Sequence, residues 1–144
     1  MSAISEKVRK AIFLKSNVVA VVGAAKLTAI YEAKAPNEAV LPYGIMQRFS
    51  AGEVKYTFGV TLALEDDIWL LKVLADEDSS TTKEPQEFAE DMLAVWLATL
   101  GNTLTISGNT VAWLARHADM PPLDEPKNDR FIYHRGALIR VKTE

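Results

Sequence analysis

The stretch that decides the fold runs from Ile68 to Leu100 and reads IWLLKVLADEDSSTTKEPQEFAEDMLAVWLATL. In its first part, apolar residues surround a lone Lys72 on both faces, as in a strand buried inside a sheet. Its last part predicts a long helix, with Thr82 as the N-cap, Pro85 in the first turn and Gly101 as the stop. Because so few residues join this strand to this helix, we expect the two to pack on each other.

The predicted helix is amphipathic, since large apolar residues recur at the spacing of one helical face. These residues are Phe88, Met92, Val95, Trp96 and Leu100. Large amphipathic rings are costly to leave in water, so we expect Trp69, Trp96 and Trp113 in the core or in an interface.

Alternating apolar residues predict further strands on both sides of this unit. We expect them at residues 27–33, 43–50, 55–64, 104–107, 110–118 and 130–143. Ala51-Gly52 and Glu65–Asp67 are expected to form turns on either side of strand 55–64. Gly108-Asn109 is a two-residue turn signal that predicts a hairpin. The proline-rich residues 121–129 predict a polar loop, and Gly136 predicts a bulge in the last strand.

The first residues of the chain predict an amphipathic helix, because Ile4, Val8, Ala11 and Ile12 fall on one stripe. The whole order therefore predicts an α+β fold. Its sheet is antiparallel or mixed, and the N-terminal helix and one long central helix are packed on one face. A length of 144 residues without a dividing linker predicts a single domain.

The composition restricts the chemistry and the compartment. With no cysteine, the chain has no disulfide, thiol nucleophile or thiolate metal site, which suits a reducing compartment such as the cytosol. Residues 7–25 resemble a secretory signal in having basic residues before an apolar run. We prefer the interpretation as a helix, because Lys15, Ser16 and Asn17 interrupt the apolar region.

The net charge of −3 hides a segregation of charge along the chain. Residues 1–26 carry five basic side chains and one acidic, whereas residues 65–91 carry ten acidic side chains and two basic. Such segregation lets copies of one molecule meet with opposite charge. We therefore predict partner contacts at Lys7, Arg9, Lys10, Glu65, Asp66, Asp67, Asp76, Glu77 and Asp78. A basic patch interleaved with aromatic residues is missing, which argues against a dedicated nucleic-acid binder.

The sequence offers little for catalysis, cofactors or metals. The carboxylates at 65–67 and 76–78 lack the spacing of a calcium loop, so we expect them to be solvated. His117 and His134 have no second histidine at ligand spacing, and no nucleophile motif is present. Lys72 is the one unusual placement, and we expect its ammonium group to meet a carboxylate or a partner subunit. We predict no catalytic, cofactor-binding or metal-binding residue.

Three pieces of the chain resemble the tail-completion or tail-terminator proteins of long-tailed bacteriophages. The first is LPYGIMQRFS at residues 41–50, and the second is Leu71-Lys72-Val73 with the serine-rich segment that leads to the helix. The third is Tyr133-His134 followed by Gly136 and a terminal strand. Ala137-Leu138 and the loop at 121–126 depart from the pattern and leave the subfamily open.

The resemblance implies a structural virion protein of the phage neck, assembled in the host cytoplasm. Such a subunit forms a ring, usually a hexamer, on the head-proximal end of the tail tube and offers its other face to the head connector. DNA passes through the lumen without being bound specifically, and no membrane, cofactor or catalytic residue is implied.

Two other interpretations stay open from the sequence. The first is a small α+β adaptor that works as a monomer or dimer, either as another neck component or as a host-binding module. The second is an enzyme that uses Lys72, His117 or His134, which requires a pocket that gathers at least two of these side chains.

Overall fold

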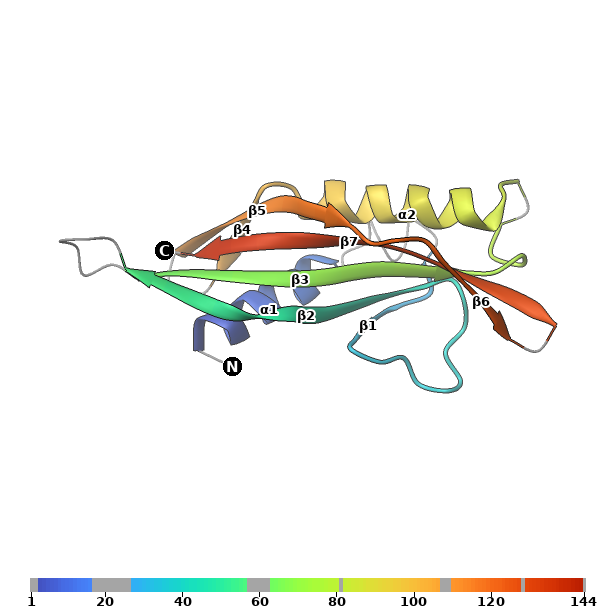
Figure 1. Cartoon of the computed structure of the whole chain (residues 1–144), viewed down its shortest axis with the longest axis horizontal. Coiled ribbons are helices and arrows are strands. Elements are labelled where there is room, and N and C mark those ends of the chain that lie inside the picture. Colours follow the sequence, from blue (N-terminus) through green and yellow to red (C-terminus); the bar gives the residue numbers. More distant parts are fainter. Residues whose placement is uncertain are drawn as a thin grey trace.

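The computed structural model describes residues 3–16, 27–56, 63–80, 82–106, 110–127 and 129–143. Within these ranges the chain forms two helices and seven strands (Figure 1). In order they are α1 (Ala3–Ser16), β1 (Ile30–Glu32), β2 (Tyr43–Tyr56), β3 (Ala63–Ala75), α2 (Pro85–Leu100), β4 (Thr103–Ile106), β5 (Thr110–Asp119), β6 (Leu123–Lys127) and β7 (Arg130–Thr143). The predicted α+β fold is confirmed. None of the helices in the described ranges is long and apolar enough to cross a membrane.

The described strands form one mixed sheet in the order β1-β2-β3-β7-β5-β4. The short β1 runs parallel to β2, and the other pairs are antiparallel. β5 and β6 both pair with β7, β5 along residues 137–143 and β6 along residues 130–134. β6 therefore continues the course of β5 beyond Pro121 and Pro122, and the predicted polar loop at 121–129 is wrong in that it contains a strand.

β3 lies in the middle of the sheet and is buried on both faces, as its sequence predicts. Its residues Trp69, Leu71, Val73 and Ala75 alternate toward the side where both helices pack. The main core is formed there by these residues together with the apolar faces of α1 and α2. On the opposite side, loop residues 35–41 cover one end of the sheet, where Leu74 contacts Ile45 and Ile132.

The ends of α2 agree with the sequence at one terminus and differ at the other. Gly101 adopts a φ of 67°, and its N–H donates to the carbonyl of Leu97 at 3.0 Å, which confirms the predicted stop. Pro85 is in the first turn as expected, but the N-cap is Glu84 and not Thr82. Ser80 Oγ accepts a hydrogen bond from the N–H of Thr82, so this segment forms a turn before the helix begins.

Two predicted turns are wrong, because β2 and β3 are longer than the sequence suggests. Glu65–Asp67 lie inside β3 and pair with residues 141–143 of β7. Ala51-Gly52 lie inside β2, where the pairing with β3 is irregular between Ser50 and Glu53. Polar residues in an extended strand resemble a turn when only the alternation is read. Most of the predicted strand at 55–64 lies outside the described residues.

Gly136 is not a bulge, since β3 and β7 keep a continuous register in which Lys72 faces Gly136. A Cβ atom at position 136 would lie 2.9 Å from the Cβ of Lys72 and 3.0 Å from the carbonyl oxygen of Leu71, so close approach of the strands requires glycine there. The irregularity lies instead on β5, between Arg116 and Ala118. β4 and β5 form the predicted antiparallel hairpin, whose turn residues lie outside the described ranges.

Candidate assembly surfaces

The basic residues of α1 differ in their exposure and in their contacts within the subunit. Lys7 and Lys10 are exposed. Arg9 is partly buried and forms ion pairs with Glu6 in the same helix and with Glu32 of β1. These two carboxylates raise the pKa of Arg9. Arg9 therefore links α1 to the edge of the sheet, and Lys7 and Lys10 remain available to another molecule.

The acidic residues 65–67 do not form the exposed turn that the sequence predicts. Asp67 is only 1% exposed and lies on the helix side of β3, where Arg48 Nη2 of β2 donates to its carboxylate at 3.2 Å. This ion pair between neighbouring strands was not visible in the sequence. Glu65 and Asp66 lie in β3 between β2 and β7. The predicted contact of residues 65–67 with a partner stays a prediction, although the side chain of Asp67 is buried inside the subunit.

Residues 76–78 form the acidic turn between β3 and α2. Asp76 is buried, and its Oδ1 accepts hydrogen bonds from the Asp78 N–H at 3.1 Å and from the Ser79 hydroxyl at 3.0 Å. Arg130 of β7 contacts Asp76 at 3.4 Å and Asp78 at 3.0 Å. Asp76 thus holds the turn, while the side chains of Glu77 and Asp78 are exposed.

The two charged regions lie apart along the elongated subunit. α1 occupies the left half of Figure 1, whereas the turn between β3 and α2 lies at the right end, near the tip formed by β6 and β7. The exposed basic residues of α1 and the exposed acidic residues of the turn therefore belong to different ends of the molecule.

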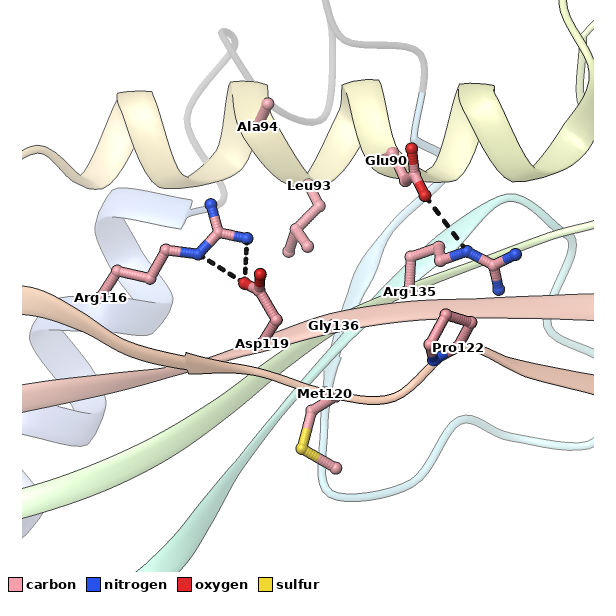
Figure 2. A pocket seen from close by; sticks show the side chains of 9 residues that line it. All are labelled: Glu90, Leu93, Ala94, Arg116, Asp119, Met120, Pro122, Arg135 and Gly136. Carbon is pink, nitrogen blue, oxygen red and sulfur yellow. Dashed lines mark hydrogen bonds and ion pairs between the residues drawn. The ribbon is translucent and has the colours of Figure 1, made fainter.

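A groove of about 350 Å³ lies between α2 and the edge of the sheet at the end of β5 (Figure 2). Its lining residues are Glu90, Leu93, Ala94, Arg116, Asp119, Met120, Pro122, Arg135 and Gly136. Two ion pairs border it: Arg116 Nε donates to Asp119 within β5 at 2.7 Å, and Arg135 of β7 lies 3.5 Å from Glu90 of α2. A second groove of about 270 Å³ continues along α2 and shares Arg116 with the first.

The residues considered for catalysis lie on β3 and β7, on the face of the sheet opposite the helices, or on β5. Lys72 of β3 faces Gly136, and His134 lies two residues away on β7. His134 Nε2 contacts Glu125 at 2.9 Å, and burial lowers the pKa of His134 although Glu125 opposes this shift. His117 is exposed on β5, separated from β3 by β7. Neither of the two grooves beside α2 is lined by Lys72, His117 or His134.

The sequence did not predict that two large aromatic side chains, Phe49 and Trp113, are exposed. Trp69 and Trp96 are buried as expected, but Trp113 is 57% exposed and Phe49 is 53% exposed. For Trp113 the expected place in the core is wrong, and a place in an interface stays a prediction. Their positions near opposite edges of one sheet depend on strand order, which residue alternation does not give.

Comparisons with known proteins support the fold. No protein-family model matches the sequence, and no curated protein matches it. Among solved structures, a chain of the "Virion of native gene transfer agent (GTA) particle" is similar, with a TM-score of 0.67 and 17% sequence identity. The superposition covers 100% of this chain and 99% of that chain. At this identity the likeness shows a common fold over the full length.

Proposed function

We propose that this protein is a structural component of a phage-like virion, and that it forms a ring that joins the tail to the head. The observation that carries the proposal is the full-length similarity to a chain of a gene transfer agent virion. The resemblance of residues 41–50, 71–73 and 133–136 to tail-terminator proteins points in the same direction. In this proposal six copies close on the head-proximal end of the tail tube.

The distribution of charge supports a subunit with two different ends. A cyclic ring presents one end of every subunit to the tail tube and the other end to the head connector. Lys7 and Lys10 lie on α1, whereas Glu77 and Asp78 lie at the far end of the sheet (Figure 1). Six copies of each end form two rims that carry different exposed charged residues, which favours binding of different partners at the two rims.

A capping assay tests this function. Purified protein is added to tail tubes that were polymerised without it, and the tube ends are imaged by negative stain. We expect a ring at one end of the tubes only, because the two rims differ. The double variant Glu77→Lys with Asp78→Lys is expected to weaken binding at one rim. Glu87→Lys, which makes the same kind of charge reversal at an exposed residue of α2, is the control.

Bare tube ends at saturating protein would contradict the proposal. A monomer or dimer that binds a neck component without forming a ring would support the adaptor in its place.

A further inference from the structure

A pocket of about 340 Å³ is lined by α1, by the end of β1 and by neighbouring residues of β2 and β3. β1 ends at Glu32, and Ala33 adopts a φ of 62°, which is rare for alanine. The N–H of Ala33 donates to the carbonyl of Met46 at 2.7 Å, and the N–H of Lys34 donates to the carbonyl of Glu32 at 2.6 Å. The chain therefore turns at Ala33, and the pocket lies where β1 leaves β2.

Trp69 of β3 lines this pocket with an indole ring whose N–H lacks a hydrogen-bond partner. The residue is 2% exposed, and its Nε1 has no acceptor in the part of the chain that the structure describes. The other buried tryptophan, Trp96, donates from Nε1 to Ser16. An indole N–H can only donate, and a buried donor without an acceptor is unfavourable. An acceptor supplied by another molecule would therefore stabilise the subunit at Trp69.

Two arginines also line the pocket. Arg9 of α1 forms ion pairs with Glu6 and Glu32. Arg48 of β2 forms an ion pair with Asp67 at 3.2 Å. The side chains of Arg9 and Arg48 are 26% and 20% exposed, so solvent reaches both of them. A guanidinium group has five N–H donors, so Arg9 can bind a further acceptor while it keeps both of its carboxylates.

The surroundings of the pocket carry an excess of positive charge. Lys7 and Lys10 are exposed on α1, and neither forms an ion pair with another described residue. Together with the two arginines they outnumber the three carboxylates that the arginines contact. An acceptor with one negative charge therefore suits the site better than a neutral acceptor. A phosphate with two charges suits it less, because Glu32 itself lines the pocket.

We propose that this pocket binds a carboxylate on an acidic side chain of the protein that meets the α1 end of the subunit. The carboxylate accepts hydrogen bonds from Arg9 and from Nε1 of Trp69. Arginine matches the two oxygens of a carboxylate in geometry and in charge. The nitrogen of Trp69 is buried, so side chains of the lining shift when the ligand enters. This inference rests on the proposed function and names the chemistry of the partner at that rim.

The three tryptophans of the chain give a direct test in solution. Protein labelled with ¹⁵N only at tryptophan gives one indole N–H resonance for each residue, and Trp69→Phe and Trp113→Phe assign them. The probe is the α-amide of N-acetylglutamate, and the control at equal ionic strength is N-acetylglutamine amide, which lacks the charge. We expect the glutamate probe to move the Trp69 resonance saturably, with a Kd on the order of 1–10 mM. The resonance of Trp96, which is bonded to Ser16, is expected to stay in place.

Two outcomes of the titration would overturn the inference. The first is a Trp69 resonance that stays in place, or that moves equally with the glutamine control. The second is a stronger response to dimethyl phosphate than to the glutamate probe, which would assign the pocket to phosphodiesters and not to carboxylates.

Arg9→Gln and Arg130→Gln form a matched pair of variants. Each arginine contacts two carboxylates, but Arg130 contacts those of the acidic turn after β3. We expect Arg9→Gln to weaken binding of the glutamate probe by about tenfold or more, because it removes the charged donor. Arg130→Gln is expected to bind the probe as the unmodified protein does. Equal affinities in the two folded variants would overturn the assigned site, and the titration of the unmodified protein decides if Arg9→Gln does not fold.

The two proposals fail differently. A protein that stays monomeric with the tail tube present, but shows the Trp69 response, removes the ring and keeps the carboxylate site. Rings that cap tail tubes while the Trp69 resonance ignores the glutamate probe remove only the carboxylate site.

Discussion

Trp96 and Ser16 join the two helices through a hydrogen bond inside the core. The Nε1 of Trp96 donates to the Oγ of Ser16 at 2.7 Å, and both residues are 0% exposed. Ser16 is the last residue of α1, and Trp96 lies in the last half of α2. The bond satisfies two buried polar groups and fixes the end of α1 against α2, so both helices form one layer on the sheet.

Trp96→Ala is expected to lower the free energy of unfolding by about 3–5 kcal/mol, because a fully buried ring is replaced by a cavity. The hydroxyl of Ser16 also loses its partner. Denaturant unfolding measures the change, and Val40→Ala at an exposed residue is the control, with an expected change within about 0.5 kcal/mol. A loss below about 1 kcal/mol for Trp96→Ala would contradict this packing.

Gly44→Ala is expected to destabilise the protein by about 1–3 kcal/mol, since a Cβ atom there has no room. It would lie 2.9 Å from Cζ3 of Trp96 and 3.3 Å from Cγ1 of Ile30. A double-mutant cycle with Trp96→Leu isolates the clash with the indole ring. We expect Gly44→Ala to cost less in the Trp96→Leu background. Equal costs in both backgrounds would show that the ring is not the obstacle.

Charge reversal is expected to have different effects at Asp67 and at Glu77. Asp67→Lys places a cation beside Arg48 in a buried site, so we expect a loss of about 3–5 kcal/mol or failure to fold. Glu77→Lys changes an exposed side chain and is expected to keep the unfolding midpoint. Thermal unfolding followed by circular dichroism compares the two. A stable Asp67→Lys subunit would contradict the buried pair.

His134 is expected to make stability depend on pH. Its pKa in the folded protein is lowered below the value of 6.5 of an unfolded chain, chiefly by burial. The unfolded state then binds the proton first as the pH falls, so stability is complete above the unfolded pKa and decreases as pH falls through the folded pKa.

Urea unfolding between about pH 7.5 and about pH 5.5 measures this slope. His134→Asn is expected to flatten it, with His117→Asn at an exposed position as the control. If His134→Asn leaves the slope unchanged, the lowered pKa of His134 is not the cause of the pH dependence.

The central strand, α2 and the hairpin of β4 and β5 were predictable because their patterns are local. Alternation around Lys72, the apolar stripe with Trp96 and the stop at Gly101 each follow from a few neighbouring residues. Glu65–Asp67 misled the prediction, because a polar run inside a long strand has the composition of a turn. Asp67 is buried beside Arg48 of β2, and this contact depends on the register of the two strands.

The exposed positions of Phe49 and Trp113 were not predictable for the same reason. They are 64 positions apart in the sequence, and their places on strands near opposite edges of the sheet follow from the strand order. The groove beside α2 exists because β4 pairs with only the first part of β5. Alternation gives the faces of a strand, but the edges of a sheet are known only from the topology.

Imaging of the purified protein tests the central claim most directly. Negative-stain class averages are collected with and without tail-tube protein, and native mass spectrometry gives the mass of the same samples. We predict closed rings with six-fold symmetry, which bind to one end of the tubes. Monomers at every concentration, in the presence and absence of tail tubes, would contradict the account.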